Sequence, residues 1–365
     1  MIDVRLRRVP GIGVLALILV LAGLCGLGAG ARADVAAAGE RDWATFKARF
    51  LQPDGRVIDD YHGGVSHTES QGFGMLFAVA FADREAFERI WAWTDANLRW
   101  DGTWLHAWRY EPGSGTPVPD PNNATDGDFF IAWALERAAR RWHEPLYAEA
   151  ARRIARDIRS LLVAEVAGRT VLLPGFSGFR DGERITVNLS YYVFPAIEAL
   201  IRLDPAPVWD LLRQDGLELL EDARFGHWGL PPDWLQIAPN GEIRPAADRP
   251  ARFGYDAVRI PLYVVWAGLG TVERLRLYRS FWQAHWRDRR HPGWASLDDR
   301  SVAPYDAANG LKAVGMLVEA AEGADWQAAA LPAIEAADDY YSAALILLTR
   351  VAAADLLQRS ATRDL

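Results

Sequence analysis

The sequence has almost no cysteine. Cys25 is the only one among 365 residues, so a disulfide within the chain is excluded and a buried core must hold the fold. Runs of basic residues are also missing beyond the extreme N-terminus, and the formal net charge is −8. Because phosphate backbones attract basic surfaces, we expect no nucleic acid among the partners of this protein.

Several motifs that carry known chemistry are absent as well. The chain has no Gly-x-x-x-x-Gly-Lys phosphate loop, no Gly-x-Ser-x-Gly nucleophile turn and no His-Glu-x-x-His zinc helix. A segment starting at Asp120 begins like a calcium loop, but it has Ala124 at its fifth position and no acid at its twelfth. The seven histidines are scattered. The sequence therefore supports no metal site.

Apolar and aromatic residues, in contrast, are abundant. Hydrophobic residues make up 50% of the chain, and tryptophan occupies 16 positions. This apolar fraction is enough for a large globular core. Tryptophan is open to two interpretations, because its large flat ring can stack on a sugar or fill a thick core.

Residues 1–33 are predicted to be a secretory signal peptide. Three arginines near the N-terminus precede an almost wholly apolar stretch over 11–30, and the Ala-Arg-Ala at 31–33 fits the pattern of a cleavage site. The alternative is an uncleaved membrane anchor, because this stretch approaches the ~20 residues of a span. We favour cleavage, which predicts a periplasmic or secreted protein that has no membrane association after cleavage.

The rest of the chain has apolar residues at helical spacing and few alternating stretches that would indicate strands. The predicted class is therefore all-α, with about a dozen helices. They cover 42–50, 70–81, 84–98, 127–142, 146–162, 189–203, 208–214, 255–267, 272–286, 303–322, 328–337 and 340–357. Short β-hairpin segments are expected near 170–173 and 242–244. No segment resembles a flexible linker, so residues 34–365 are expected to form a single domain.

Acidic residues stand beside glycine and aromatic residues where three of these helices begin. Glu69 lies in a Thr-Glu-Ser-Gln-Gly segment, Asp126 in Thr-Asp-Gly-Asp, and Asp256 in Gly-Tyr-Asp. Each acid alone could simply stabilise a helix start, and Ser66 with Glu69 fits a capping box. Three such segments together indicate one end of a helical assembly that presents several carboxylates, an arrangement typical of glycosidases.

The residues around Asp126 also carry a family resemblance. Segment 124–135, Ala-Thr-Asp-Gly-Asp-Phe-Phe-Ile-Ala-Trp-Ala-Leu, resembles the signature of glycoside hydrolase family 8. Glu136 departs from the family, which usually has a small or aliphatic residue there, and we expect its side chain to face solvent. Further similarity at 68–75, 188–192, 232–234 and 255–259 extends the resemblance over nearly all of 34–365. It implies one catalytic domain with the fold of an (α/α)6 barrel, consistent with a dozen helices.

The resemblance also implies an activity. Within the family, the sequence is most similar to the periplasmic endoglucanases that accompany bacterial cellulose synthases. It implies endo-acting hydrolysis of β-1,4-glucosidic bonds with inversion, in which Glu69 is the general acid and Asp256 the general base. Asp126 matches a family acid, which we interpret as the group that holds the distorted sugar and supports the proton donor.

Physical chemistry agrees with this division of roles. An apolar pocket would keep Glu69 protonated, and Arg259, three residues after Asp256, would favour the ionised base. An inverting enzyme must also accommodate a water molecule, so we expect the two carboxylates to lie roughly 6.5–9.5 Å apart.

The remaining expectations concern binding. Trp108 and Tyr191 match family positions that line the cleft, where rings stack on glucosyl units. Tyr255, Trp234 and Arg259 are further candidates for substrate contact, although the two rings could instead belong to the core. The reaction needs no metal and no organic cofactor, because two carboxyl groups, water and ring distortion suffice. The expected partners are a β-glucan and a cellulose synthase complex, and the expected state is a monomer.

Alternative functions stay open. The first is a hydrolase of the same fold that acts on chitosan, xylan or mixed-linkage glucan. The second is a non-catalytic glucan-binding accessory protein of the export machinery, although such a protein would not need both Glu69 and Asp256. A polysaccharide lyase of helical fold is a weaker third alternative.

Overall fold

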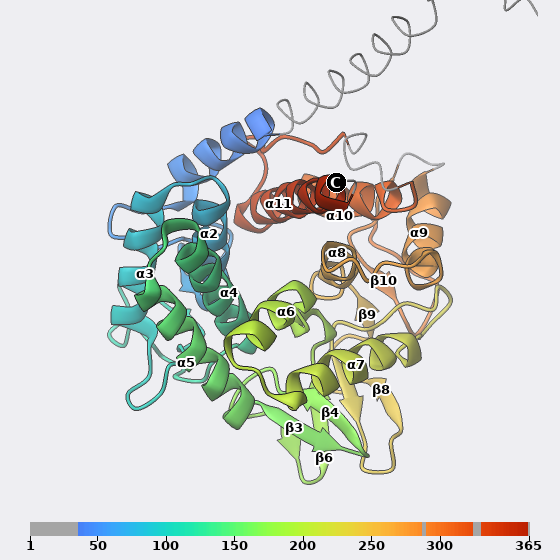
Figure 1. The fold of residues 1–365 in the computed structure, drawn as a ribbon. Helices are drawn as coiled ribbons and strands as arrows, with labels where there is room; N and C mark the ends of the chain where they lie inside the picture. Colours follow the sequence, from blue (N-terminus) through green and yellow to red (C-terminus); the bar gives the residue numbers. More distant parts are fainter. Residues whose placement is uncertain (1–35, 287–289, 324–329, 364–365) are drawn as a thin grey trace, which may run out of the picture.

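The described residues, 36–286, 290–323 and 330–363, form a ring of helices in the computed structural model of the protein (Figure 1). The predicted signal peptide, 1–33, lies outside them. A first helix covers 36–50. The other α-helices are α2 (Thr68–Ala80), α3 (Arg84–Leu98), α4 (Thr125–Trp142), α5 (Pro145–Leu161), α6 (Phe194–Leu203), α7 (Pro207–Asp222), α8 (Arg259–Trp266), α9 (Val272–Trp286), α10 (Asn309–Ala320) and α11 (Tyr340–Arg363). The predicted all-α class is confirmed.

Six of these helices form a closed inner circuit. Helix α2 packs against α4, α4 against α6, α6 against α8, α8 against α10, and α10 against α11, which returns to α2. A helix in this position must be apolar on every side. All residues of α8 are buried, and Glu69 is the only residue of α2 between Thr68 and Val79 that is not. Burial therefore already distinguishes Glu69 from its neighbours.

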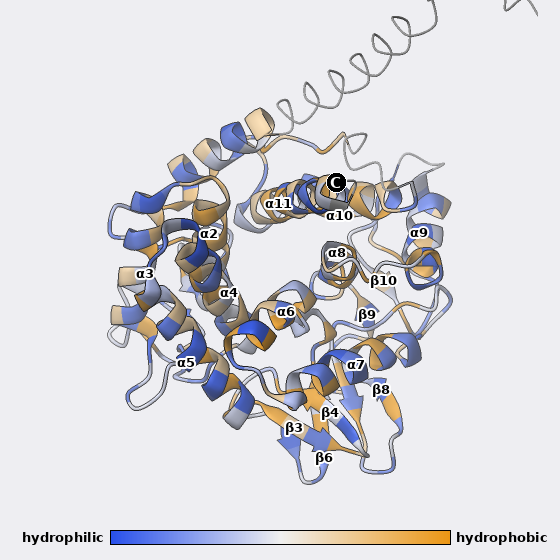
Figure 2. Cartoon of the chain, in the orientation of Figure 1, coloured by the Kyte–Doolittle hydropathy of each residue, from blue (hydrophilic) through white to orange (hydrophobic). Residues whose placement is uncertain are grey.

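The outer helices are amphipathic. Helix α3 contacts α2, α5 contacts α4 and α6, α7 contacts α6, and α9 contacts α10. Helix α5 buries Ala151, Ile154 and Ile158 along one face. In Figure 2, α5 and α7 carry hydrophilic residues alternating with hydrophobic ones. This alternation of inner and outer helices confirms the predicted (α/α)6 barrel.

Proline changes the extent of three predicted helices. The predicted helix 189–203 is divided into the 3-10 turn η1 (Leu189–Tyr191) and α6, because Pro195 has no N–H with which to continue a helix. The predicted helix 303–322 begins only at Asn309, after a turn that contains Pro304. Residues 330–337 of the predicted helix 328–337 are not helical. The described residues contain eleven α-helices, where about a dozen were predicted.

Short strands occupy the connections between helices. Strand β3 (Val163–Val166) pairs with β4 (Arg169–Leu172), and one antiparallel sheet contains β5 (Arg180–Asp181), β6 (Arg184–Val187), β7 (Leu235–Ile237) and β8 (Ile243–Pro245), in that order. The hairpin segments expected near 170–173 and 242–244 are thereby confirmed. Two further pairs are β1 (Ser66–His67) with β2 (Arg109–Tyr110) and β9 (Arg252–Phe253) with β10 (Ala295–Ser296). Strand β1 directly precedes α2, and β9 precedes the turn that leads into α8.

Glu136 is 4% exposed and pairs with Arg140 at 3.3 Å and with Arg202 at 3.2 Å, so the expectation that it faces solvent is wrong. Arg202 comes from α6, which no local pattern around Glu136 could indicate.

Helix α11 has the length and apolar composition of a membrane span, but 78% of its most apolar stretch is buried within the ring. Its position in the inner circuit accounts for its composition.

Candidate active site

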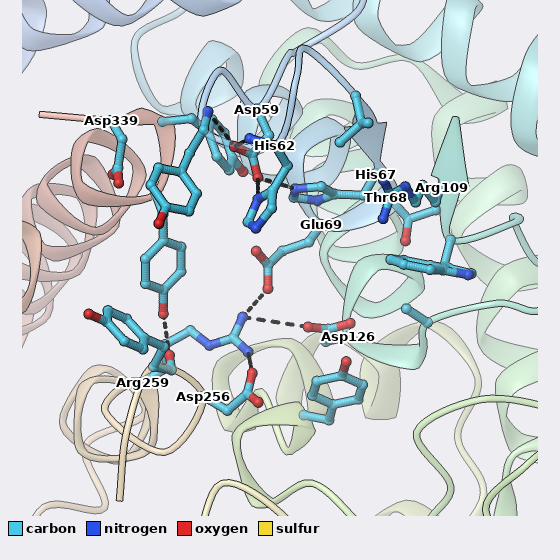
Figure 3. A pocket seen from close by; sticks show the side chains of 18 of the residues that line it. Asp59, His62, His67, Thr68, Glu69, Arg109, Asp126, Asp256, Arg259 and Asp339 are labelled. Carbon is cyan, nitrogen blue, oxygen red and sulfur yellow. Dashed lines mark hydrogen bonds and ion pairs between the residues drawn. The ribbon is translucent and has the colours of Figure 1, made fainter. Parts of the chain in front are cut away.

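A cavity of about 770 Å³ lies where the inner helices α2, α4 and α11 begin. Its wall includes Glu69, Asp126, Asp256 and Arg259 (Figure 3). The structure therefore brings together the three acids that the sequence placed at separate helix starts. N–H groups at a helix start have no helical acceptor and favour nearby negative charge, which suits this end of the ring to carboxylates.

Glycines in α2 and α4 allow these two helices to approach closely enough to place Glu69 beside Asp126. A Cβ atom at Gly127 would collide with the side chain and backbone of Thr68, and one at Gly72 would lie 2.6 Å from Phe130 Cβ. Gly127 directly follows Asp126, and Gly72 lies three residues after Glu69. Their small size is what joins the Glu69 and Asp126 segments into one wall.

Arg259 is the centre of the charged network. Its Nη1 contacts Glu69 Oε2 and lies 3.5 Å from Asp126 Oδ2, while its Nη2 lies 2.9 Å from Asp256 Oδ1, as Figure 3 shows. Nη2 also donates to Ser190 Oγ at 3.0 Å. The arginine is only 2% exposed, so these partners compensate for its loss of water. One buried cation is thus shared by three acids.

Glu69 and Asp126 behave as a pair. Burial raises the pKa of Asp126 well above its usual range, the neighbouring Glu69 carboxylate raises it further, and Arg259 opposes the rise. A buried carboxyl group beside another carboxyl group does not ionise easily. Asp126 therefore retains its proton at pH values where an isolated aspartate has lost it.

Asp256 is a stronger base than an ordinary aspartate. Burial, above all, raises its pKa to about 6, and the charges of Asp233 and Glu69 add to the rise that Arg259 opposes. The expected ion pair with Arg259 is present and favours the ionised form, but burial outweighs it. About 31% of the Asp256 side chain remains exposed, which leaves it accessible from the cavity.

Three of the predicted binding rings line the cavity, namely Trp108, Tyr191 and Tyr255. Trp108 is held by a hydrogen bond from its Nε1 to Asp120 at 2.8 Å. Trp234 is not among the described residues that line the cavity. It lies behind Tyr191, with ring centroids 6.0 Å apart in an edge-on arrangement, so it supports that ring and its contact with substrate stays a prediction.

A cluster of Asp59, His62 and His67 on the cavity wall was missed in the sequence. Asp59 Oδ2 lies 2.7 Å from His62 Nδ1 and 3.5 Å from His67 Nε2. Burial raises the pKa of Asp59, but hydrogen bonds from His67 and His62 lower it to about 2. His67 Nδ1 in turn accepts the Ser70 N–H at 3.0 Å and caps α2, the helix of Glu69. The only sequence signal was the loose spacing of the two histidines.

Two tyrosines at the start of α11 were also missed. Tyr340 and Tyr341 line the cavity, and the hydroxyl of Tyr341 donates to the carbonyl of Tyr255. They follow Asp338 and Asp339 at the start of an apolar helix. The pattern of acids and aromatic residues that marked the other helix starts is therefore repeated here and could have identified them.

Comparisons with known proteins agree with this geometry. The family model described as glycosyl hydrolases family 8 matches residues 25–355. The chain is 41% identical to a probable endoglucanase of Novacetimonas hansenii over 316 residues, which are 86% of this chain and 91% of the relative. It is 42% identical to an endoglucanase of Cellulomonas uda over 272 residues, 74% of this chain and 75% of the relative.

Solved structures give the same result. The structure of the endo-beta-1,4-glucanase CMCax from Acetobacter xylinum superposes with a TM-score of 0.82 at 39% sequence identity. The match covers 87% of this chain and 98% of that one. The similarity therefore extends over most of the chain and nearly all of that structure.

Proposed function

This chain belongs to glycosyl hydrolase family 8, and on that premise we propose that it is an endo-β-1,4-glucanase, which cleaves internal bonds of cellulose or a related glucan. The observation that carries the proposal is the convergence of Glu69, Asp126 and Asp256 on Arg259 in one cavity. Relatives named endoglucanases at 41% and 42% identity support the reaction and the class of substrate.

We further propose an inverting mechanism. Glu69 donates a proton to the glycosidic oxygen as the bond to the leaving sugar breaks, and Asp256 takes a proton from the water that attacks the anomeric carbon on the opposite face. Asp126, whose pKa is raised by burial and by the neighbouring Glu69, supports Glu69 as the proton donor. The raised pKa of Asp256, about 6, supports its role as base, because it is ionised at neutral pH yet binds a proton readily.

The cavity walls support binding of a neutral sugar chain. Trp108, Tyr191 and Tyr255 supply ring faces, and the carboxylates between them accept hydrogen bonds from sugar hydroxyls. Neutral glucosyl units need no charged partner, which agrees with a site whose single buried cation is already shared by three acids.

The cellular setting is part of the proposal. The pattern of residues 1–33 supports export to the periplasm or beyond, and the sequence resemblance supports action on the product of a cellulose synthase complex. We propose that the protein works there as a monomer.

The test is release of reducing ends from soluble carboxymethyl cellulose by the wild type and the variants Glu69→Gln and Asp256→Asn. The matched control is Glu88→Gln, whose side chain is 48% exposed on α3. Wild-type and control activity with two inactive variants supports the proposal, and the anomer first released, followed by proton NMR, distinguishes inversion from retention.

Other outcomes select the alternatives. Activity confined to chitosan, xylan or mixed-linkage glucan would replace the substrate. Glucan binding that is unchanged in both variants, without hydrolysis by any of the proteins, would favour the accessory protein. An unsaturated product that absorbs ultraviolet light would indicate a lyase.

A further inference from the structure

Asp233 is buried behind the turn that carries Asp256. Only 6% of its side chain is exposed. Its Oδ1 accepts three backbone hydrogen bonds, from the N–H groups of Gly254 at 2.9 Å, Asp256 at 3.2 Å and Ala257 at 2.9 Å. A single carboxylate oxygen therefore holds the backbone at Asp256 and on both sides of it.

These N–H groups belong to the turn that leads into α8, which begins at Arg259. Asp233 supplies their acceptor from a segment 21 to 24 residues earlier. A charged acceptor makes stronger hydrogen bonds than a neutral one, so the turn is held more firmly than a local serine or asparagine would hold it.

The neighbouring residues are shaped for this contact. A Cβ atom at Gly254 would lie 2.7 Å from Asp233 Oδ2, so the close approach requires glycine. Arg252 Nε donates to Oδ2 at 3.2 Å, and the carbonyl of Arg252 accepts the N–H of Asp233 at 2.8 Å. Segment 252–257 thus wraps around Asp233. Within this segment, Tyr255 and Asp256 line the cavity.

We propose that Asp233 is a positioning residue for the general base: it orients the Asp256 carboxylate through the turn 254–257, and its negative charge makes Asp256 a stronger base. This inference rests on the proposed function of Asp256. Charged and titratable groups also face Asp256 from the other elements around it, namely Glu69 of α2, Tyr191 of η1, Arg259 of α8 and Tyr341 of α11, with the Asn188 amide beside them.

Two variants separate position from charge. In Asp233→Asn the amide oxygen can still accept the three N–H groups, but the charge is lost. The acid limb of the pH profile of kcat/KM should then move down by roughly 0.5 to 1 pH unit. Asp233→Ala also removes the acceptor, so kcat should fall on the order of 10²-fold while KM stays within about threefold.

Asp42 offers a matched control. It is 3% exposed, accepts the Ile334 N–H at 3.0 Å and binds Arg350. Like Asp233, it is therefore a buried carboxylate that binds a backbone N–H and an arginine. It is not among the described residues that line the cavity. Asp42→Asn should lower the thermal midpoint and leave the pH profile unchanged. If Asp233→Asn does the same, Asp233 is merely structural and the proposal is overturned.

A titration without turnover separates this inference from the proposed function. The carboxyl carbon of Asp256, assigned with Asp256→Asn, is followed by NMR over pH in the wild type and in Asp233→Asn. A lower pKa in the variant supports the coupling even if the wild type hydrolyses no glucan, a result that would refute the proposed function alone. Identical titrations in an active enzyme would refute the role of Asp233 alone.

Discussion

Arg259 Nη2 lies 2.9 Å from Asp256 Oδ1, while the other terminal nitrogen of the same guanidinium contacts Glu69. One buried cation therefore lies between the proposed base and the proposed acid. A change in Arg259 therefore alters the contacts of both groups and the pKa of Asp256, which the pH dependence of the enzyme reports.

The wild-type profile of kcat/KM should fall on its acid side with an apparent pKa of about 6. Burial is the main cause that raises the pKa of Asp256 to about 6, and only the ionised base can activate water. The rate should therefore drop about tenfold for each pH unit below this value. Steady-state kinetics between about pH 4 and about pH 8 measure the limb. A limb at the ordinary aspartate value, near about pH 4, would contradict the assignment of the base.

The variant Arg259→Lys should move that acid limb to higher pH and lower kcat. Lysine carries the charge but lacks the two terminal nitrogens of the guanidinium, so it cannot contact Glu69 and Asp256 together. Arg259 lowers the pKa of Asp256, and weakening the contact lets it rise. The control is Arg137→Lys, which alters a bidentate contact with Asp355 (2.6 and 3.0 Å) outside the described cavity wall. An unmoved limb in Arg259→Lys would rule out this coupling.

The variant Gly127→Ala should lose most of its activity. The added methyl group would collide with Thr68 and push α4 away from α2, so Asp126 and Glu69 would separate. A displacement near 1 Å at reacting groups costs on the order of 10²-fold in rate. The control is Gly115→Ala, where nothing lies within 4 Å of the new atom. Comparable kcat values for the two variants, measured on the same substrate, would show that the close approach of α2 and α4 is not required.

The variant Trp108→Ala should raise KM about tenfold, equivalent to about 1.4 kcal/mol, with kcat within about threefold. The ring is expected to bind the sugar equally in the ground and transition states, because it stacks on the chain and touches no reacting bond. Trp286→Ala serves as control, since Trp286 is 40% exposed and is not among the described residues of the cavity wall. An equal effect in the control would remove the evidence for stacking at Trp108.

Local pattern was sufficient for much of the fold. Predicted helices 84–98 and 272–286 coincide with α3 and α9, because their ends are set by residues within the helix and its immediate neighbours. The starts of α2 and α4 were also indicated, and with them Glu69 and Asp126. Such features depend on spacing along a few turns, which a sequence displays directly.

Contacts between distant segments were not predictable in the same way. Asp233 contacts the turn 254–257 from a segment more than 20 residues earlier, and Arg202 reaches Glu136 from another helix. The sequence indicated the influence of Arg259 on Asp256 but not the larger influence of burial, because burial is a property of the assembled ring. These contacts and the pKa of Asp256 depend on charges and burial in the folded chain, which spacing along the sequence does not display.

The closure of the ring has a consequence for how the chain acquires its structure. Helix α11 contacts α2, and the Tyr340 N–H donates to Asp60, a residue 280 positions earlier. Contacts of such separation are costly to form early, because a long loop must be ordered before they are made. Helix α11 therefore completes both the inner circuit and the wall of the cavity. A chain in which α11 has not yet packed against α2 possesses every proposed catalytic carboxylate but lacks the wall that Tyr340 and Tyr341 supply, so activity should arise only once this helix has docked.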